Sequence, residues 1–595
     1  MLRAPRRDAA AAATAGPPPM SSPQSDRPLF GPTYRLIGLS VVMGLCGALA
    51  AIVFDAMVQL AQDLLLGRLG GYVPPEVGVL EPELRLPSGV ERLWLPLVTT
   101  LGGLLSGFIV YRWAPEAEGH GTDAALAAYH QRAGEVRPRI PLIKAITSAL
   151  TIGSGGVAGR EGPTAQISVG LGTIVSRGLK LRGQERRTLL LAGMAAGLSA
   201  MFRAPLGMAI FAVEILYSGM VFESEALIYT VIAAVTAYAA FGLYGGWTPL
   251  FEIPSGLSFN HPASLLSFAL LGLLAGVLGA LLPRLLYGAR DLFRRLPGPP
   301  HLRPAAGGLL VGLLAVGAPQ ILGTGYGWVE LSMAGKLSLG TVLLILLLKG
   351  PSMALTIGSG GSGGVFAPTV TLGAMLGAAL GMALQGHLPG PELPVAAYVV
   401  VGMAALFAGA ARTPISTLIM VAEMTGGYGL IVPAMSANII AFLVQRSLTH
   451  GAAHPTLYES QVESREDSPL HRGVFVRRAL EIVERGHVDG SEIQLPRLIS
   501  LLQYGEPIPV GDREGGRLVA VEIQAGSALD GRDVASTLGR VKGLTAIAVL
   551  RAEGMILPRG PTVLRAGDRL LAVVAPGAHD ALVQLARRPP SAPAP

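Results

Sequence analysis

The sequence ALTIGSGG occurs twice in this chain of 595 residues, at Ala149–Gly156 and again at Ala354–Gly361. The same offset also pairs Lys144 with Lys349. Eight identical residues in register with a paired lysine are hard to obtain by chance, even in a sequence rich in glycine and alanine. The match therefore predicts an internal duplication.

A second pair of segments supports the duplication. GMAAGLSAMFRAPLGMAIFAVEI begins at Gly193, and GMAALFAGAARTPISTLIMVAEM begins at Gly402. Their alignment brings Glu214 opposite Glu423. The two halves are predicted to span about 34–243 and 263–450. In duplicated membrane proteins, the substrate commonly lies at the interface between the halves.

The composition is that of a membrane protein with many spans. Hydrophobic residues make up 51% of the chain and charged residues 14%, against about 25% charged in an average soluble protein. The net charge is +7, and much of the basic excess falls at the termini and in short loops. We interpret it as contact with anionic lipid of the bilayer, and we expect no nucleic acid partner. The single cysteine, Cys46, permits no disulfide within one chain.

Glycine and proline interrupt the apolar segments, and several segments are shorter than the roughly 20 residues that a membrane span needs. Broken helices at membrane depth are tolerated where they line a cavity, which indicates a transport function. The apolar segments are 34–62, 93–112, 141–152, 163–178, 187–200, 205–218, 226–243, 263–287, 305–317, 340–350, 366–385, 396–410, 413–424 and 428–447.

The two ends of the chain differ from its middle. Residues 1–30 lack periodicity and a convincing signal peptide, so we expect a disordered cytoplasmic tail before a transmembrane domain at 31–460. Residues 461–515 are predicted to be a linker with helices, and 516–590 a small regulatory domain. Strand-like patterns occupy 517–523, 545–550 and 569–574, and helix-like patterns occupy 471–485, 530–538 and 578–588.

Two glycine-rich loops, Gly153–Pro163 and Gly358–Pro368, each precede an expected helix. A proline in the first turn costs no hydrogen bond, and the glycines let several backbone N–H groups surround one point. Such a helix start can bind an anion. A nucleotide-binding phosphate loop is excluded because Arg160-Glu161 stands where its Gly-Lys-Ser/Thr should be. Glycines that only allow close helix packing remain an alternative.

Glu161 is the most informative single residue. An ionisable group between apolar helices is expensive, and by default it indicates a functional site. A carboxylate beside an anion pathway can occupy the anion's place when ionised and leave it when protonated. The alternative is a structural salt bridge with Arg160, although adjacent residues on a helix point in different directions.

These motifs together resemble the CLC family of chloride channels and chloride/proton exchangers. The resemblance rests on GREGP at Gly159–Pro163, GGVFAP at Gly363–Pro368 and the paired proline-to-glutamate helices, and it covers about 34–460. It implies a homodimer with one chloride pathway per subunit, built from two inverted halves. It also implies that Glu161 is the external gating residue. The implied anion-binding residues are Gly119, His120, Gly121, Arg160, Glu161, Gly162, Gly364, Val365, Phe366, Ala367 and Tyr458.

Within that set, the resemblance gives the central chloride to the backbone N–H groups of Val365 and Phe366 and to the hydroxyl of Tyr458. A tyrosine that anchors the last helix at the membrane surface is the alternative for Tyr458. Where the family has Gly-Ser-Gly-Ile-Pro, this chain has Gly-His-Gly-Thr-Asp at 119–123. His120 can donate an N–H to the anion or point away from it, which leaves the preference among chloride, nitrate and fluoride open.

A second departure concerns protons. Exchangers of this family typically have a proton-relay glutamate directly after the position of Glu214, and here that position is Ile215. Isoleucine cannot carry a proton, so the expected function is a passive chloride channel opened by protonation of Glu161. Chloride/proton antiport is the alternative. Glu214 is expected to be structural and not a replacement relay.

The C-terminal region is similar to the RCK-type regulatory module of potassium channels and transporters. The similarity is clearest at Pro558–Leu571, where Gly567-Asp568 is expected to form a turn before the last strand. It implies a dimeric domain that senses a small ligand, with a cyclic dinucleotide as one candidate; a purely structural dimerisation domain is the alternative.

Taken together, we expect an all-α polytopic membrane protein with a CLC-like inverted repeat and a small α+β cytoplasmic C-terminal domain. The expected location is the bacterial inner membrane, with both termini in the cytoplasm. No TVGYG-like potassium filter is present in the sequence. The histidines lack the spacing of metal ligands, so no enzyme activity, metal or cofactor is expected.

Overall fold

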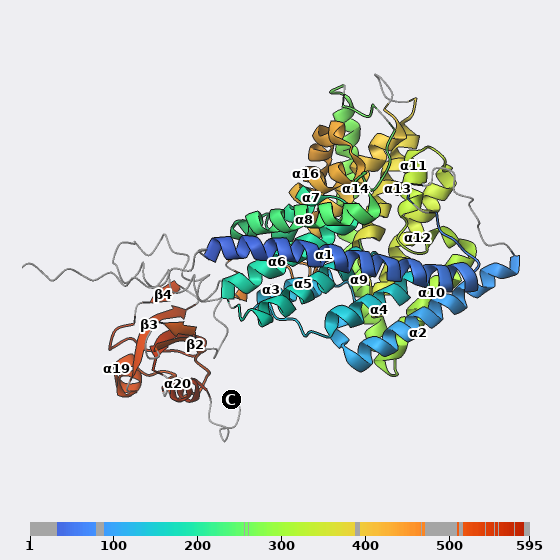
Figure 1. Ribbon diagram of the computed structural model, residues 1–595. Helices are drawn as coiled ribbons and strands as arrows, with labels where there is room; N and C mark the ends of the chain where they lie inside the picture. The colour runs from blue at the N-terminus through green and yellow to red at the C-terminus, as the bar shows by residue number, and fades with distance from the viewer. Residues whose placement is uncertain are drawn as a thin grey trace, which may run out of the picture.

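The structure is a computed structural model with a helical membrane body and a small C-terminal domain (Figure 1). It describes residues 32–75, 77–78, 89–181, 183–254, 256–259, 261–386, 393–465, 467–469, 508–510, 516–541, 543–551, 554–556, 558–575 and 578–587. The expected N-terminal tail and the helix-like pattern at 471–485 lie outside these residues.

Each half of the membrane body contains eight helices within the described ranges. The first half holds α1 (Pro32–Gln62), α2 (Leu95–Trp113), α3 (Thr122–Gln131), α4 (Ile140–Gly153), α5 (Glu161–Gly178), α6 (Gly183–Phe202), α7 (Pro205–Glu214) and α8 (Leu227–Gly245). The second holds α9 (Ser264–Arg295), α10 (Arg303–Gly317), α11 (Tyr326–Met333), α12 (Leu339–Gly358), α13 (Phe366–Leu384), α14 (Val395–Ala411), α15 (Pro414–Thr425) and α16 (Ile431–Leu448).

All fourteen apolar segments predicted from the sequence coincide with helices. Two helices were not expected, α3 and α11, because they are only 10 and 8 residues long and carry polar side chains. The apolar segment at 340–350 continues as α12 to Gly358, since Pro351 is accommodated inside that helix. Short helices of this kind are possible at membrane depth because neighbouring helices bury their ends.

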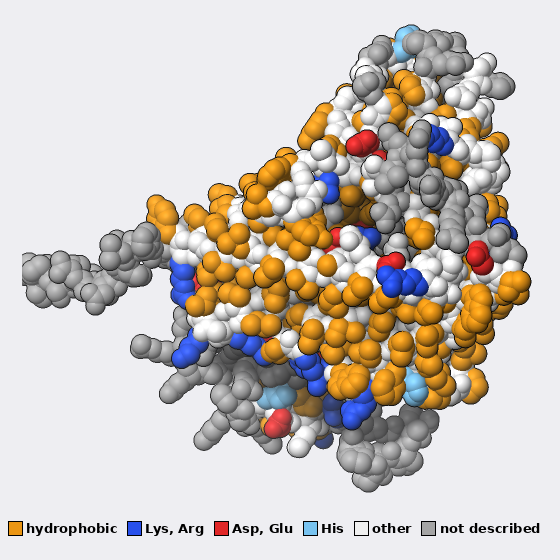
Figure 2. All heavy atoms as spheres, turned by 45° about the vertical axis from the view of Figure 1, so that its right-hand side comes forward, with side chains coloured by type: hydrophobic (Ala, Val, Ile, Leu, Met, Phe, Trp, Pro, Cys, Tyr) orange, Lys and Arg blue, Asp and Glu red, His pale blue; other side chains and the backbone are white. Residues whose placement is uncertain are grey.

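Seven helical stretches among the described residues are long and apolar enough to cross a membrane: Tyr34–Leu69, Val90–Trp113, Ser224–Gly245, Ser264–Arg295, Leu339–Gly358, Phe366–Leu384 and Tyr428–Leu448. Their exposed side chains are largely leucine and valine. In the space-filling view, hydrophobic side chains cover a broad part of the visible face, and Lys and Arg gather along its lower margin (Figure 2). This distribution is typical of a protein embedded in a bilayer.

The duplication is visible in matching local structure. Gly155 and Gly360 occupy equivalent loop positions and have φ angles of 96° and 98°, a conformation that residues with a side chain rarely adopt. The buried side chain of Lys144 donates to the carbonyls of Ala117 and Gly119. Its repeat partner Lys349 donates likewise, to the carbonyls of Ile321 and Gly323.

The repeat-related glutamates bind reciprocally across the two halves. Glu214, at the end of α7, accepts hydrogen bonds from the N–H groups of Ile415 and Ser416 in the first turn of α15. Glu423, near the end of α15, accepts from the N–H groups of Leu206 and Gly207 in the first turn of α7. Each glutamate therefore satisfies unpaired N–H groups at a helix start. These contacts support the expected structural role of Glu214.

The C-terminal domain is a five-stranded antiparallel sheet with helices. Its strand order is β1-β2-β5-β3-β4. The elements are β1 (Ile508–Val510), β2 (Gly516–Glu522), α19 (Val534–Thr537), β3 (Leu544–Arg551), β4 (Gly554–Ile556), β5 (Arg569–Val574) and α20 (His579–Ala586). The sequence predicts β2, β3, β5 and α20 closely. The pattern at 530–538 gives only the short helix α19.

Two details of this domain bear on the predicted boundaries and turn. The three residues of β1 pair with β2, so the sheet begins inside the segment predicted to be a linker. The alternation of so short a strand is too brief to recognise in a sequence. Gly567, two residues before β5, has a φ of 85°, as expected for a turn residue. The neighbouring carboxylate of Asp568 accepts two hydrogen bonds from Arg551.

Candidate functional site

Backbone hydrogen bonds bring three glycine loops from both halves to one place. The N–H of Gly159 donates to the carbonyl of Gly364 at 2.7 Å, and the N–H of Gly364 donates back to the carbonyl of Gly159 at 2.8 Å. The N–H of Gly363 donates to the carbonyl of Gly119. A Cβ on Gly162 would lie only 2.7 Å from the carbonyl oxygen of His120, so a side chain at this position would force the loops apart.

Helices α5 and α13 begin at this junction, as the two glycine-rich loops predict. α5 starts at Glu161 and α13 at Phe366, with Pro163 and Pro368 in their first turns. The first N–H groups of a helix have no acceptor within it and carry partial positive charge. Two such ends meeting at one point provide several donors for an anion without a fixed cation, which favours weak, reversible binding.

The carboxylate of Glu161 lies at this junction and is 3% exposed. Its Oε1 accepts a hydrogen bond of 2.5 Å from the hydroxyl of Tyr326. Its Oε2 accepts no hydrogen bond within the described residues. That oxygen faces the backbone of both loops, because a Cβ on Gly364 would lie 3.4 Å from it and a Cβ on Gly159 would collide with it. The carboxylate therefore occupies the space between the two helix starts.

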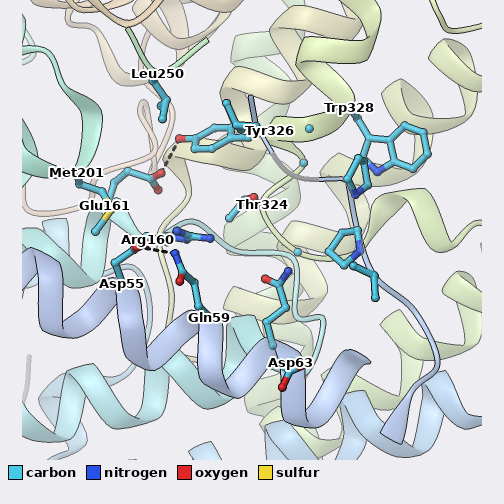
Figure 3. A pocket seen from close by; sticks show the side chains of 18 of the residues that line it. Asp55, Gln59, Asp63, Arg160, Glu161, Met201, Leu250, Thr324, Tyr326 and Trp328 are labelled. Atoms are coloured by element: carbon cyan, nitrogen blue, oxygen red, sulfur yellow. Dashed lines mark hydrogen bonds and ion pairs between the residues drawn. The ribbon is translucent and has the colours of Figure 1, made fainter. Parts of the chain in front are cut away.

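A cavity of about 480 Å³ opens beside Glu161, and it is lined by α1, by the loop before α11 and by the first residues of α11. Figure 3 shows Glu161 and Tyr326 pointing toward each other at its wall, with Asp55 and Gln59 on α1 below them. Arg160 pairs with Asp55. The alternative of a salt bridge between Arg160 and Glu161 is therefore wrong, because the two side chains leave the helix in different directions.

On the other side of the junction, His120 and Tyr458 are in contact. Their ring centroids are 5.5 Å apart, and the Nδ1 of His120 is buried with no partner in the described part of the chain. Tyr458 is 3% exposed and lies beyond α16 in an irregular segment. A membrane-surface anchor would be exposed, so that alternative for Tyr458 is wrong. Its side chain lies beside Thr122.

Asp123 explains how this segment is held. Its two oxygens accept hydrogen bonds from the N–H and the hydroxyl of Ser460, at 2.7 and 2.9 Å. The aspartate that replaces the family's proline therefore fixes the chain just after Tyr458.

Tyr326, the partner of Glu161, was missed by the sequence analysis. It lies in a short helix with no apolar periodicity, and only the fold brings it to Glu161.

Ile215 is fully buried directly after α7. Its backbone carbonyl accepts a hydrogen bond from the side chain of Gln461. The neighbouring Glu214 is turned away toward α15, so it does not fill the place of the missing relay carboxyl. Among the described residues, no group of three or more His, Cys, Asp or Glu side chains is arranged to hold a metal ion.

Comparison with known proteins agrees with this arrangement. Residues 102–446 match the family described as voltage gated chloride channel, and residues 518–586 match the TrkA-C domain. A ClcB-like chloride channel protein of Ralstonia nicotianae is 30% identical over 73% of this chain and 98% of its own length. An H(+)/Cl(-) exchange transporter ClcA of Salmonella arizonae is 31% identical over 69% of this chain and 85% of its own length.

Solved structures share the fold. A slow cyanobacterial Cl-/H+ antiporter superposes with a TM-score of 0.61 at 24% identity, covering 70% of this chain and 95% of the antiporter. A CLC-type fluoride/proton antiporter gives a TM-score of 0.60 at 21% identity, covering 73% of this chain and 98% of the antiporter. With its two glycine loops, its buried glutamate and its C-terminal TrkA-C domain, this chain belongs to the CLC family of chloride transport proteins.

Proposed function

We propose that this protein exchanges chloride for protons, as a homodimer in the bacterial inner membrane with both termini in the cytoplasm. The observation that carries the proposal is the position of Glu161. Its carboxylate lies between the starts of α5 and α13, where the backbone donors for an anion converge. The same donors cannot hold a carboxylate and a chloride ion together, so the two compete for one place.

Protonation decides this competition. An ionised Glu161 is held by the hydroxyl of Tyr326 and blocks the junction. A neutral carboxyl group loses its attraction to the helix starts and moves toward the cavity, which leaves its place to chloride. Each exchange of the side chain for an anion therefore moves a proton one way and chloride the other, and no cofactor is needed.

Exchange is favoured over the passive channel that Ile215 led us to expect. The Salmonella relative carries the name of a proton/chloride exchange transporter, and both structural relatives are antiporters. The Ralstonia relative carries a channel name. The missing relay carboxyl removes one route for protons. It does not remove the competition between the Glu161 carboxylate and chloride, on which the proposed exchange depends.

The proposed anion site has an inner part as well. We assign to it the backbone N–H groups of Val365, Phe366 and Ala367, the hydroxyl of Tyr458 and the ring of His120. The support for His120 is its buried, unpartnered Nδ1 beside Tyr458, since a buried polar atom normally has a hydrogen-bond partner. Chloride between the two rings would supply that partner.

A regulatory role is proposed for the C-terminal domain. Its similarity to the TrkA-C domain supports the binding of a small ligand, for which a cyclic dinucleotide is one candidate. The domain would act on chloride flux through the segment that follows Tyr458.

Purified protein in liposomes, with an imposed chloride gradient and a proton-sensitive dye, tests the exchange. We expect chloride running downhill to drive protons uphill. Chloride flux without proton movement would establish the channel, and the absence of any chloride flux would contradict the assignment of an anion pathway at this junction.

The variant Glu161→Gln tests the role of the carboxylate. We expect it to abolish uphill proton movement, because an amide has no proton to exchange at neutral pH. Asp63→Asn is the matched control: Asp63 lines the same cavity, but its side chain is largely exposed and pairs with Arg68. Asp63→Asn should retain the coupling between the two ions.

A further inference from the structure

A second group of buried polar and ionisable side chains lies around the backbone that follows Ile215. The exchange described above does not use this group. It consists of Tyr129 and His130 at the end of α3, Tyr217 and Glu223 in the connection between α7 and α8, and Arg465 and Ser468 in the segment after Tyr458. We refer to these six residues as the inner cluster. All except Arg465 are essentially inaccessible to solvent.

Hydrogen bonds fix the tautomer of His130 in this cluster. Its Nε2 lies 3.1 Å from the carbonyl oxygen of Leu216. A carbonyl only accepts, so Nε2 carries the hydrogen. The Nδ1 lies 2.8 Å from the hydroxyl of Ser468 and accepts from it in the neutral ring. The basic nitrogen of His130 therefore faces the Ser468 hydroxyl. This hydroxyl donates to the neutral ring and could accept a hydrogen bond from the protonated ring.

Glu223 is the acidic centre of the cluster and is 0% exposed. Its Oε2 accepts a hydrogen bond of 2.7 Å from the hydroxyl of Tyr217. Its Oε1 accepts one of 2.6 Å from Arg465, whose side chain is 33% exposed. Arg465 thus binds the buried carboxylate and also reaches the surface, so it can leave Glu223 by turning into water.

The cluster is continuous with the position of the missing carboxyl. Ile215, Leu216 and Tyr217 are consecutive, and the carbonyl of Leu216 accepts from His130 while the ring of Tyr217 lies 5.7 Å from the ring of His130. The segment that carries Arg465 is bound here too, since the N–H of Val462 donates to the carbonyl of Leu216. The titratable side chains of His130 and Tyr217 therefore lie beside the backbone of Leu216, the residue that follows Ile215.

We propose that Glu223 takes up protons from the inner side of the membrane, in place of the carboxyl that Ile215 lacks. This inference rests on the proposed exchange. A proton from water adds to the Glu223 carboxylate as Arg465 turns outward, and the carboxylic acid later returns it through the Tyr217 hydroxyl and water. Only hydrogen bonds and one O–H bond form and break, and no electrons are transferred.

Burial supplies the driving force for this step. Burial disfavours a charged carboxylate and a nearby cation favours it, so removal of the cation shifts a buried carboxylate toward the neutral acid. Contact with Arg465 therefore favours the charged form of Glu223, and the departure of Arg465 favours the neutral acid. His130 is a positioning residue that holds the carbonyl of Leu216. The titratable and charged groups facing Glu223 and its hydrogen-bonded partners are Tyr129, His130, Arg187, Tyr217, Glu225 and Arg465.

A purely structural role for the cluster makes different predictions. The contact between Glu223 and Arg465 also ties the segment after Tyr458 to the connection between α7 and α8. A broken tie would lower protein stability and reduce both ion fluxes together. A proton site would change the number of protons moved per chloride and the dependence of proton flux on inner pH.

The test uses the full-length protein in liposomes with an inward or outward pH gradient. We expect Glu223→Gln to lower the ratio of proton flux to chloride flux roughly tenfold or more, and Glu223→Asp to restore most of it. Glu225→Gln is the matched control. Glu225 lies two residues away and 3.8 Å from the same arginine, but it is 65% exposed.

A second variant covers the case in which Glu223→Gln does not fold. Arg465→Met should shift the inner-pH dependence of proton flux to higher pH, because the carboxylate loses its cation. A normal flux ratio in Glu223→Gln, or an unshifted profile in Arg465→Met, would overturn the inference while the exchange still stands. A wild-type protein that moves chloride without protons would overturn the exchange and this inference together.

Discussion

In the proposed anion site, the histidine at position 120 would change the chemistry through a single side chain. A hydroxyl in the equivalent position of the family offers one short donor, whereas an imidazole reaches farther and covers more of the junction. Its Nδ1 is buried and has no hydrogen-bond partner in the described part of the structure, and its ring packs against Tyr458. An unsatisfied buried polar atom is unfavourable unless a ligand completes it.

The corresponding prediction concerns chloride affinity. His120→Leu keeps the bulk of the ring and removes its polar atoms, so it should weaken chloride binding about tenfold, the equivalent of one lost hydrogen bond to a charged group. His120→Ser should lose less, because the hydroxyl can still donate. Titration calorimetry with chloride measures both variants. Equal affinity of wild type and His120→Leu would show that the ring points away from the anion, and His261→Leu, an exposed histidine, serves as the control.

At the level of elements, α7 and α15 are short helices whose starts are each capped by the other's glutamate. Glu214 accepts three hydrogen bonds from Ile415 and Ser416 and is fully buried. Glu423 accepts two and is partly accessible. Because a short helix cannot sustain itself through its own hydrogen bonds, these contacts help to hold both helices beside the proposed anion site.

Because Glu214 is more deeply buried than Glu423, substitutions of the two residues are predicted to change protein stability by different amounts. Glu214→Gln should lower the free energy of unfolding by about 1–3 kcal/mol, since one buried N–H loses a charged acceptor. Glu423→Gln should lower it less, because water can replace the lost contact. Thermal unfolding in detergent measures the difference. Neither variant should change the ratio of protons to chloride, and a lost ratio in Glu214→Gln would show that this residue is a relay and not a cap.

On the scale of the whole molecule, the membrane body and the C-terminal domain are stabilised in different ways. The domain has its own apolar core, formed by residues such as Val519, Val549 and Leu570, and an ion pair closes one end of its sheet. Asp568 is 2% exposed and binds Arg551 through both oxygens, at 2.9 and 2.7 Å. Burial alone would raise the pKa of Asp568. The hydrogen bonds from Arg551 and from the N–H of Arg565 outweigh it and hold the pKa below its usual value.

The stability of this domain is therefore predicted to depend on acid. A lowered carboxyl pKa stabilises the fold at neutral pH, and this contribution disappears as the pH falls below about 4 and through the lowered value. Asp568→Asn should lower the free energy of unfolding by about 3–5 kcal/mol at neutral pH, because Arg551 loses its buried carboxylate partner. The loss should shrink in acid, where Asp568 of the wild type is already protonated. Limited proteolysis of the full-length protein measures this effect, as the rate at which the protease cleaves the C-terminal domain. Asp580→Asn, which changes a highly exposed carboxylate, should not alter the cleavage.

The duplication and the order of helices could be predicted because both depend on local sequence. Apolar runs mark the helices, and the repeated glycines mark the loops that open α5 and α13. The contacts of Glu161 and Arg160 could not be predicted, since their partners Tyr326 and Asp55 reach the junction from helices far away in the chain. The inner cluster was invisible for the same reason. His130, Glu223 and Arg465 come from three separate segments, and none of them belongs to a recognisable motif.

The paired hydrogen bonds between Gly159 and Gly364 have a mechanical consequence. They fasten the two halves together at the point where a rocking transporter would have to open, and Ser362 adds further bonds to Thr147 and Ser148 on α4. Large swings of one half against the other would break this seam twice in every cycle. In the proposed exchange, turnover would therefore be carried by side-chain atoms that move while the two halves stay joined, so its speed should depend little on the viscosity or thickness of the surrounding lipid.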